Sequence, residues 1–365
     1  MNPIPCLDLK RQHAEVKAEI WSAFEEVYKN TAFSGGPFVQ KFEDKFAAFC
    51  ETDYAVGVNS GTSALHLALI ALDIKAGDEV ILPANTFIAT AWAVSYVGAK
   101  IVFADCDPHT WEIDPIDVEK KITAKTKLII GVHLYGQPFD VDKIKAIAEP
   151  KRIMVMEDSA QAHGARYKGK RAGSLTEIAC FSFYPGKNLG TTGEGGGITT
   201  SNQKLVEHLH SLRNHGSKER YYHDEIGFNM RMGGLEGAAL DVKMKYIENW
   251  NEQRKLIAKR YQTEIVNQKI KMQLQPDFAD SVYHLFVVTV ENREHFIGYL
   301  NENQISPALH YPVPCHLQKA YLSLGYKKGD FPNAEYLADH CVSLPMFAEL
   351  TEDEVSHVIK VVNAY

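Results

Sequence analysis

The segment FSFYPGKNLGTTGEGGGITT, residues 181–200, places one lysine, Lys187, in a glycine-rich turn between two strand-like stretches. Five glycines follow this lysine within ten positions. A lysine in such a turn is typical of a phosphate-binding loop, of a flexible surface turn, or of a covalent anchor for a cofactor. These three interpretations require different neighbouring motifs, so the rest of the chain has to discriminate between them.

A nucleotide-binding P-loop requires the pattern G-x-x-x-x-G-K-[ST]. Gly186 and Lys187 match this pattern, but Phe181 stands where the first glycine is required. Asn188 occupies the position of the Ser or Thr that binds magnesium. The segment therefore argues against an NTPase, and it leaves the surface turn and the cofactor anchor open.

The first half of the chain alternates between strand-like and helix-like patterns. Several of the strand-like segments are continuous apolar runs, which are expected when helices cover both faces of a strand. This alternation predicts an α/β fold with a mainly parallel sheet covered by helices. We expect residues 177–185 and 195–202 to form an antiparallel pair at an edge of the sheet. The predicted strands are 54–58, 79–84, 100–106, 127–136 and 152–159, and the predicted helices include 9–28, 39–49, 62–74 and 90–98.

The pattern changes near residue 235. Residues 235–265 read as one long helix that leads to a second domain of α+β type. A strand at 282–290 and a helix at 294–303 follow. The last helix begins at Glu352, where Thr351 and Glu354 form a capping-box pattern. We therefore expect a large domain, residues 1–249, and a small C-terminal domain, residues 250–365.

The composition limits the classes of partner. The chain of 365 residues is 45% hydrophobic and 23% charged, as in ordinary globular proteins, and its net charge is −7. Because no basic run is present, nucleic acid is not expected as a partner. The N-terminal residues lack the apolar region of a secretory signal, and no apolar run reaches the roughly 18 residues of a membrane span. We expect a cytoplasmic protein that has no membrane partner.

The six cysteines are scattered and form no CxxC pair, which is typical of buried thiols in a cytosolic chain. Cys315–His316 and His340–Cys341 bring together two types of zinc ligand. Their spacing matches none of the usual zinc patterns, so no metal is expected.

Two further motifs carry possible chemistry. In NSGTSALHLAL, residues 59–69, Gly61 and Thr62 lead from a strand into an apolar helix, which suits an anion site but also a plain helix cap. In MEDSAQAHGA, residues 156–165, Asp158 follows a buried strand. At that position it requires a cation, either a protonated ring nitrogen of a ligand or a partner in a structural salt bridge. Both possibilities remain open for each motif.

Taken together, the motifs match the needs of an electron-sink cofactor. Such a cofactor requires a lysine, an acid facing its ring nitrogen, a phosphate cradle and a flat side chain over its ring. Lys187, Asp158 and the Gly61–Thr62 turn with Ser182 supply the first three. Phe87, in PANTFIATA, is a candidate for the fourth.

At this point the chain resembles the pyridoxal-phosphate-dependent sugar aminotransferases of the DegT/DnrJ/EryC1/StrS family, which have the fold-type I architecture. The resemblance extends over essentially the whole chain, and its motifs are specific in combination. Besides the segments already quoted, it includes FSGGPFVQKFEDKFA, RNHG and GFNMRMGGLEGAAL.

The resemblance implies a role for individual residues. Lys187 is similar to the lysine that binds pyridoxal 5′-phosphate covalently, and Asp158 to the aspartate that keeps the pyridine nitrogen protonated. Gln161 corresponds to a contact near the 3-hydroxyl of the ring, and Phe87 to the side chain that stacks on the ring. Gly61, Thr62 and Ser182 correspond to the phosphate site. Asn214 corresponds to a residue that reaches the phosphate from the neighbouring subunit, which implies a homodimer with shared active sites.

The resemblance also implies a reaction. Glutamate is the expected amino donor, and a keto group on a nucleotide-linked sugar is the expected acceptor. Residues 308–321 resemble the segment of members that aminate a 3-keto-6-deoxyhexose on dTDP. Amination of a 4-keto sugar and a non-catalytic regulatory protein on the same fold are the alternatives. Candidate substrate contacts are His163, Tyr184, His310, Tyr311 and His316, although each histidine could instead be a hydrogen-bonded structural residue.

Overall fold

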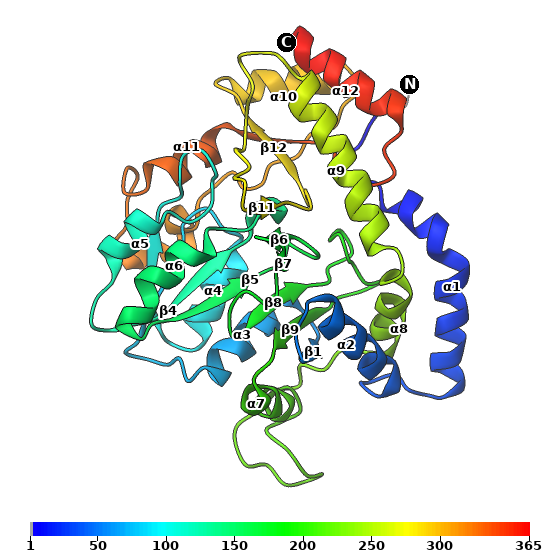
Figure 1. Cartoon of the computed structure of the whole chain (residues 1–365), viewed down its shortest axis with the longest axis vertical. Helices are drawn as coiled ribbons and strands as arrows, with labels where there is room; N and C mark the ends of the chain where they lie inside the picture. Colours follow the sequence, from blue (N-terminus) through cyan, green and yellow to red (C-terminus); the bar gives the residue numbers. More distant parts are fainter. Residues whose placement is uncertain (1–2) are drawn as a thin grey trace.

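The computed structural model describes residues 3–365 and has a seven-stranded sheet at its centre (Figure 1). Neighbouring strands are parallel from β8 through β5, β4 and β2 to β3, whereas β9 runs antiparallel to both of its neighbours. The expected α/β fold with a mainly parallel sheet is confirmed. In spatial order the strands are β1 (Tyr54–Val58), β9 (Gly196–Thr200), β8 (Ala179–Ser182), β5 (Met154–Asp158), β4 (Thr126–Val132), β2 (Glu79–Pro83) and β3 (Lys100–Ala104).

The antiparallel pair β8–β9 forms as expected, but its predicted position at an edge of the sheet is wrong. The free side of β9 pairs with β1, in a register that joins Tyr54 to Thr200 and Val58 to Gly196. Strand β1 therefore forms the edge, and β8 and β9 lie inside the sheet. The turn that carries Lys187 consequently joins two interior strands.

Helices cover both faces of the sheet, and the alternation of side chains explains the continuous apolar runs. On β2, Val80 and Leu82 pack on one face while Ile81 packs on the other. The first face is covered by α3 (Gly61–Ala71), α4 (Ile88–Tyr96) and α7 (Gln203–Arg213). The second face is covered by α2 (Pro37–Phe49), α5 (Pro115–Lys121), α6 (Val141–Ala148) and α8 (Gly234–Lys243).

The predicted single helix over residues 235–265 is two helices, α8 and α9 (Ile247–Glu264). The break lies at residues 244–246. Lys245 and Tyr246 each donate a backbone hydrogen bond to the residue three positions earlier, which tightens the last turn of α8 before α9 begins. No Gly or Pro marks this break in the sequence.

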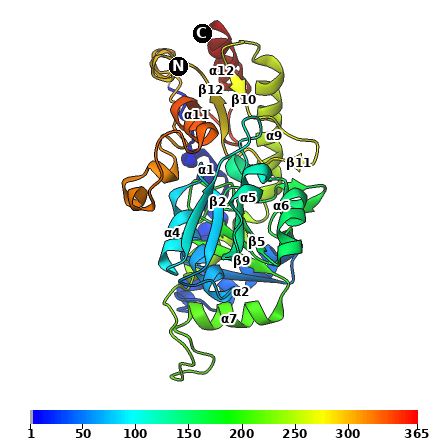
Figure 2. The same ribbon diagram turned by 90° about the vertical axis from the view of Figure 1, so that its left-hand side faces the viewer.

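A second core lies at the end of the molecule that contains both termini (Figure 2). It packs α9, α10 (Arg293–Glu302) and α12 (Glu352–Ala364) with a small sheet of β10 (Lys271–Met272), β12 (Phe286–Thr289) and β13 (Cys341–Leu344). Ile4 from the N-terminal segment joins this core and bridges to Ile305. We retain the division near residue 250 as a proposal, with the first residues packing on the small-domain side.

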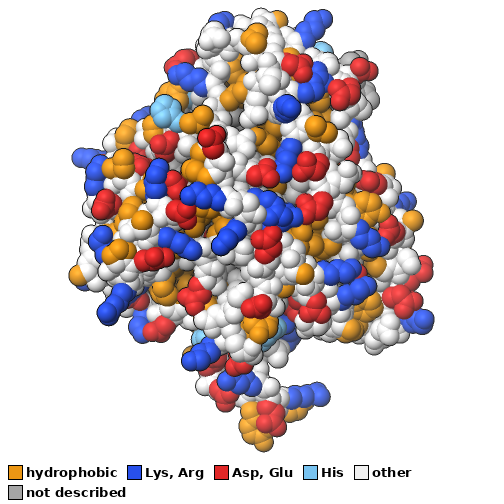
Figure 3. Space-filling view, viewed as in Figure 1, with side chains coloured by type: hydrophobic (Ala, Val, Ile, Leu, Met, Phe, Trp, Pro, Cys, Tyr) orange, Lys and Arg blue, Asp and Glu red, His pale blue; other side chains and the backbone are white. Residues whose placement is uncertain are grey.

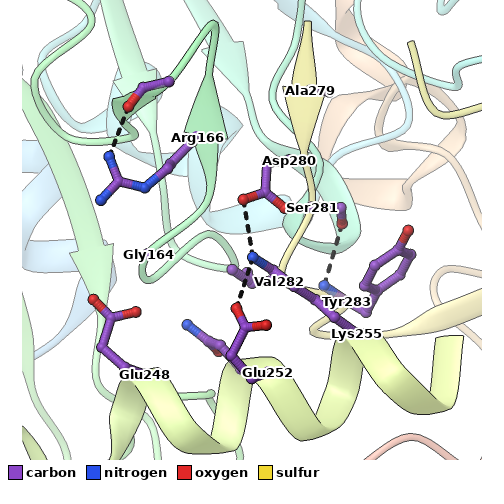
Figure 4. A network of polar contacts seen from close by, with 12 residues as sticks. Gly164, Arg166, Glu248, Glu252, Lys255, Ala279, Asp280, Ser281, Val282 and Tyr283 are labelled. Carbon is purple, nitrogen blue, oxygen red and sulfur yellow. Dashed lines mark hydrogen bonds and ion pairs between the residues drawn. The ribbon is translucent and has the colours of Figure 1, made fainter. Parts of the chain in front are cut away.

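Helix α9 also contacts the segment that follows β11 (Ala279–Asp280). Lys255 lies between Asp280 and Glu252, with Nζ 2.9 Å and 3.1 Å from their carboxylates (Figure 4). Strand β11 pairs with β6 (Arg166–Tyr167), which pairs with β7 (Lys170–Arg171). Residues 279–284 are therefore held between α9 and the large domain.

The chain after α7 projects from the body as an arm, which lies below α7 in Figure 1. Tyr221, Tyr222 and Ile226 in this arm are largely exposed. On the face shown in Figure 3, acidic and basic side chains are interspersed. In the part of the chain that the structure describes, no helix is long and apolar enough to cross a membrane.

The remaining helices, α1 (Leu9–Lys29) and α11 (Pro332–His340), pack on this framework. Arg11 of α1 makes a two-pronged hydrogen bond with Glu354 of α12, at 2.7 Å and 2.6 Å. Glu354 also completes the predicted capping box with Thr351, which is confirmed. One carboxylate thus joins the first helix to the last.

Glu354→Gln tests this link. The hydrogen bonds from Arg11 lower the pKa of Glu354 from 4.5 to about 2. Because the folded state has the lower pKa, the pair stabilises the fold above about pH 4.5, and this contribution is lost as the pH falls towards 2. The substitution should lower the free energy of unfolding by about 1 kcal/mol at pH 7, since the pair is partly exposed.

The measurement is urea unfolding of both proteins at pH 7, 5 and 3. The difference between them should shrink at pH 3. Glu352→Gln is the matched control, because Glu352 lies on α12 like Glu354 but is largely exposed in its ion pair with Arg260 of α9. This substitution should lower the free energy of unfolding less. A difference between Glu354→Gln and the wild type that does not depend on pH would contradict the assignment.

Candidate active site

A cavity of about 600 Å³ lies at the carboxyl ends of β5 and β8. This edge of a parallel sheet is where ligands bind in open α/β folds. Residues 284–285, 308, 310–311 and 346, from the C-terminal part of the chain, also line it. The cavity brings together most of the predicted site residues: Gly61, Thr62, Phe87, Asp158, Gln161, Ser182, Tyr184, Lys187, His310 and Tyr311.

Lys187 lies in a turn that folds back on itself directly after β8. The turn is closed by backbone hydrogen bonds from Lys187 to Tyr184 at 2.9 Å and from Thr191 to Phe183 at 2.8 Å. Burial lowers the pKa of the Lys187 ammonium to about 8, although the carboxylate of Asp158 acts in the opposite direction. The amine therefore gives up its proton more readily than an exposed lysine does.

Asp158 is the last residue of β5 and is almost completely buried. Its carboxylate accepts hydrogen bonds from the hydroxyl of Thr90 at 2.8 Å and from the backbone N–H of Ala160 at 3.1 Å. Burial nevertheless raises the pKa of Asp158. Among residues 3–365, no cationic side chain forms a salt bridge with Asp158, so the structural salt bridge left open by the sequence is not made. A protonated ring nitrogen would supply the missing cation.

The start of α3 forms the third part of the site. Ser60 caps the helix by accepting a hydrogen bond from the Ser63 N–H at 3.0 Å. A Cβ on Gly61 would lie 2.7 Å from the Cβ of Ser182, so only glycine lets the helix approach β8 this closely. Free N–H groups at the helix start, beside the Thr62 and Ser182 hydroxyls, suit a phosphate group.

Gln161 is held between two tyrosines at the cavity wall. Its Oε1 accepts from the backbone N–H of Tyr135 at 2.6 Å, and its Nε2 donates to the hydroxyl of Tyr311 at 3.0 Å. The ring of Tyr311 lies 5.4 Å from that of Phe87, which is half exposed. Since the Tyr311 hydroxyl accepts from Gln161, its own proton is free to be donated elsewhere.

The glycines around Lys187 allow close contacts between backbone segments. The glycines at 186–197 all lack a positive φ. A Cβ on Gly190 would overlap the carbonyl of Pro185, and a Cβ on Gly196 would overlap the carbonyl oxygen of Ser60. They therefore allow backbone segments to touch, and they bring the lysine turn and the start of α3 into contact with their neighbours.

Two predicted substrate contacts do not reach the cavity wall. His163 is fully buried, and its ring packs against Phe181 and Phe183. His316 is also fully buried, where its Nε2 lies 3.1 Å from the carboxylate of Glu335. His316 matches the structural alternative, a hydrogen-bonded residue, whereas the buried ring nitrogens of His163 have no hydrogen-bond partner among residues 3–365. Neither position supports a substrate contact.

Asn214 lies outside the cavity of its own chain. Its Oδ1 accepts a hydrogen bond from Arg231 at 2.7 Å, and it lines a separate surface depression with Ser34, Gly35 and Gly36. This location is compatible with a role in a neighbouring subunit, which stays a prediction.

Thr90 and His284 are among the cavity-lining residues that were not predicted. Thr90, which donates to Asp158, belongs to the quoted PANTFIATA motif, and its place in the first turn of α4 was the available signal. His284 lines the cavity opposite the sheet. It falls within the predicted strand 282–290, whereas β12 begins at Phe286, so periodicity gave no signal for it.

The fold and the site together define the class of protein: an α/β aminotransferase with a buried lysine and aspartate beside a helix N-terminus. A model of the DegT/DnrJ/EryC1/StrS aminotransferase family matches residues 14–363, and the chain belongs to this family. It is a pyridoxal-phosphate-dependent sugar aminotransferase, and the residues described above fit this cofactor.

Three similar proteins share 38–44% of their residues with this chain. The chain is 44% identical to the dTDP-3-amino-3,6-dideoxy-alpha-D-galactopyranose transaminase of Aneurinibacillus thermoaerophilus, over 99% of both chains. It is 42% identical to the "Pleiotropic regulatory protein" of Geobacillus stearothermophilus, over 98% of this chain and 97% of the relative. It is 38% identical to the UDP-N-acetyl-3-dehydro-alpha-D-glucosamine 3-aminotransferase of Acidithiobacillus ferrooxidans, over 98% and 97%.

The fold is similar to that of a solved relative over its full length. The crystal structure of DesV from S. venezuelae matches with a TM-score of 0.98 at 40% identity, covering 100% of this chain and 98% of that one.

Gly196→Ala tests the contact between β9 and the start of α3. The added Cβ would push the Ser60 carbonyl and displace the first N–H groups of α3, so the affinity for pyridoxal phosphate should fall roughly tenfold or more. The measurement is a spectroscopic titration of the cofactor-free protein. Gly193→Ala is the matched control, since its Cβ would meet only the flexible Glu236 side chain. Equal affinities for the two variants would contradict the argument.

Asp158→Asn tests the electrostatic coupling to Lys187. Since the Asp158 carboxylate stabilises the Lys187 ammonium, its removal should lower the pKa of Lys187 from about 8 by roughly one unit. The pH dependence of Lys187 labelling by an amine reagent, followed by mass spectrometry of the cofactor-free protein, measures this pKa. Thr90→Val keeps the charge of Asp158 and should change the pKa of Lys187 less. An unchanged or raised pKa in Asp158→Asn would rule out the coupling.

Proposed function

We propose that this enzyme transfers the amino group of glutamate to the 3-keto carbon of a dTDP-linked 6-deoxyhexos-3-ulose, giving a dTDP-3-amino-3,6-dideoxyhexose. The observation that carries this proposal is that Ala308, His310 and Tyr311 line the same cavity as Lys187. They belong to the segment 308–321, which resembles that of members that aminate a 3-keto sugar. The relative named as a dTDP-3-amino-3,6-dideoxy-sugar transaminase and the one named as a UDP-sugar 3-aminotransferase support amination at carbon 3.

The proposed roles follow from the geometry. Bound pyridoxal phosphate supplies an electron-withdrawing ring that carries the amino group between donor and acceptor. In this proposal Lys187 holds the cofactor, and its amine, with a pKa of about 8, moves a proton to and from the substrate carbon. Asp158 keeps a proton on the ring nitrogen, because a buried carboxylate without a salt-bridge partner is stabilised by a cation.

The remaining proposed contacts divide between cofactor and sugar. The start of α3, with Gly61 and Thr62, holds the phosphate together with Ser182. Phe87 covers the ring, and Gln161 approaches its 3-hydroxyl. The sugar lies against Tyr184, His310 and Tyr311, of which Tyr184 is half exposed at the mouth of the cavity.

We also propose a homodimer with shared sites. Among residues 3–365, the cavity wall has no arginine, and Lys187 is its one lysine. A nucleoside diphosphate and a glutamate both require cationic contacts. The arm after α7 projects from the body of the molecule (Figure 1). It carries Lys218 and Arg220, so the arm of a second copy of the chain would provide the missing charges.

A turnover assay of the cofactor-loaded enzyme tests the proposed function. With glutamate as donor, dTDP-3-keto-6-deoxyglucose or its galactose-configured isomer should be converted, and NMR should place the nitrogen on carbon 3. The dTDP-4-keto-6-deoxyglucose substrate and a UDP-linked 3-keto sugar serve as comparisons. Faster conversion of the 4-keto sugar or of the UDP sugar would replace the proposed substrate by that one.

Lys187→Ala completes this test. It should lower turnover by at least about a thousandfold, because it removes both the covalent anchor and the proton carrier. Glutamate should bleach the yellow absorbance of the wild-type enzyme but leave that of the variant largely unchanged. A fully active Lys187→Ala enzyme would exclude the role given to this lysine. The relative named as a regulatory protein does not favour a non-catalytic role here, since Lys187 and Asp158 are both present.

A further inference from the structure

His284 lines the cavity but has no role in the reaction proposed above. It lies between β11 and β12, on the wall that faces the lysine turn. Its Nδ1 lies 3.1 Å from Oδ1 of Asn188, the residue directly after Lys187. Its Nε2 makes no hydrogen bond with any residue in the described range 3–365, and unlike the sealed ring nitrogens of His163 it is not closed off from solvent.

A chain of hydrogen bonds fixes which ring nitrogen of His284 carries the proton. A backbone carbonyl can only accept, so the 2.8 Å contact with the His163 carbonyl identifies Nδ2 of Asn251 as the donor, and Oδ1 of Asn251 is left to accept. Nδ2 of Asn188 donates to that oxygen at 2.9 Å and to the Val282 carbonyl at 3.0 Å.

Since Nδ2 of Asn188 is committed to two acceptors, its Oδ1 faces His284 as an acceptor. The proton of a neutral His284 therefore lies on Nδ1, and Nε2 presents a lone pair.

The surroundings of His284 keep it neutral. Burial lowers the pKa of His284 well below its ordinary value, and the positive charges of Lys187 and Arg254 add to this effect. His310 and His163, which also face it, have lowered pKa values of their own and remain neutral near pH 7. Among residues 3–365, no carboxylate forms a hydrogen bond or salt bridge with His284, whose ring contact is with the Asn188 amide.

The segment that carries His284 is rigidly held. Arg254 of α9 donates to the backbone carbonyls of Tyr283 at 3.3 Å, His284 at 3.4 Å and Met346 at 2.9 Å. Residues 280–283 run alongside α9, where Lys255 anchors Asp280 (Figure 4). The lone pair of His284 is thus a preorganised acceptor.

We propose that Nε2 of His284 accepts a hydrogen bond from a ring hydroxyl of the sugar, next to the carbon that reacts at Lys187. The inference rests on the proposed function and adds a residue that determines specificity. Its neighbours at the wall, the Lys187 amine and the Tyr311 hydroxyl, are donors and suit a keto oxygen. An acceptor-only nitrogen suits a hydroxyl and discriminates against a sugar with a carbonyl or no oxygen at that position.

The two half-reactions of the holoenzyme separate this role from an action through Lys187, because both use the lysine but only the second uses the sugar. His284→Phe should slow the reaction of the aminated enzyme with dTDP-3-keto-6-deoxyglucose roughly tenfold or more, and leave the reaction with glutamate within about twofold. His284→Gln, whose amide oxygen can accept, should recover part of the sugar half-reaction.

Equal slowing of both half-reactions in His284→Phe would overturn the proposal in favour of a positioning role for Lys187. No effect on either would overturn it as well. A wild-type enzyme that converts no keto sugar would instead contradict the proposed function. The role of His284 is then tested by measuring the binding of dTDP-glucose and of dTDP. By calorimetry, His284→Phe should weaken dTDP-glucose binding several-fold and leave dTDP binding unchanged, whereas equal effects on the two ligands would overturn the proposal.

The position of the proton on the His284 ring can be measured directly. The ¹⁵N chemical shifts of the His284 imidazole in the cofactor-free protein should show a protonated Nδ1 and an unprotonated Nε2 at pH 7. A protonated Nε2 would remove the acceptor and overturn the proposal, whatever the kinetics show.

Discussion

The carboxylate of Asp158 is buried at the end of β5, where no cationic side chain of residues 3–365 forms a salt bridge with it, and the rest of the site is arranged around this constraint. An isolated buried charge is costly, and hydrogen bonds from Thr90 and Ala160 offset only part of that cost, since the pKa of Asp158 remains raised. The same cavity lowers the pKa of Lys187. The protein thus keeps an acid and an amine in one low-dielectric space. In the proposed function, a protonated ring nitrogen of the cofactor would supply the cation that Asp158 lacks, and the Lys187 amine would transfer protons.

Close backbone contacts hold these groups in place. Gly61 lets α3 approach Ser182, and Gly196 lets β9 touch the Ser60 carbonyl, so the start of α3, which is the proposed phosphate site, is packed directly on the two strands that flank the lysine turn. Lys243, a fully buried residue of α8, reinforces this junction by donating to the carbonyl of Gly190 at 2.7 Å. Burial lowers the pKa of Lys243 to about 8. A buried ammonium is tolerated here because it orders the turn in which Lys187 lies.

The sequence predicted the elements whose signal is local. Apolar runs located the parallel strands because both faces of each strand are buried, and Thr351 with Glu354 located the start of α12. Pairings between distant segments were harder, because the position of β9 depends on β1, which lies about 140 residues earlier in the chain. The break between α8 and α9 carries no Gly or Pro. The predicted strand 127–136 ends at Val132, because residues 134–136 form a turn that brings Tyr135 to Gln161.

The residues of the candidate site also differ in whether a local sequence signal identifies them. Asp158 ends β5, Gly61 begins α3 and Lys187 lies in the turn after β8, so local motifs singled out all three and the family resemblance implied their roles. His163 and His316 share the residue type of a functional group, but their burial among aromatic rings depends on tertiary packing that no motif reveals. His284 shows the opposite case. It was hidden within an apolar segment, and its chemistry arises from Asn188, Asn251 and two backbone carbonyls contributed by four separate segments. The proton position on an imidazole is a property of that network, so only the folded chain can reveal it.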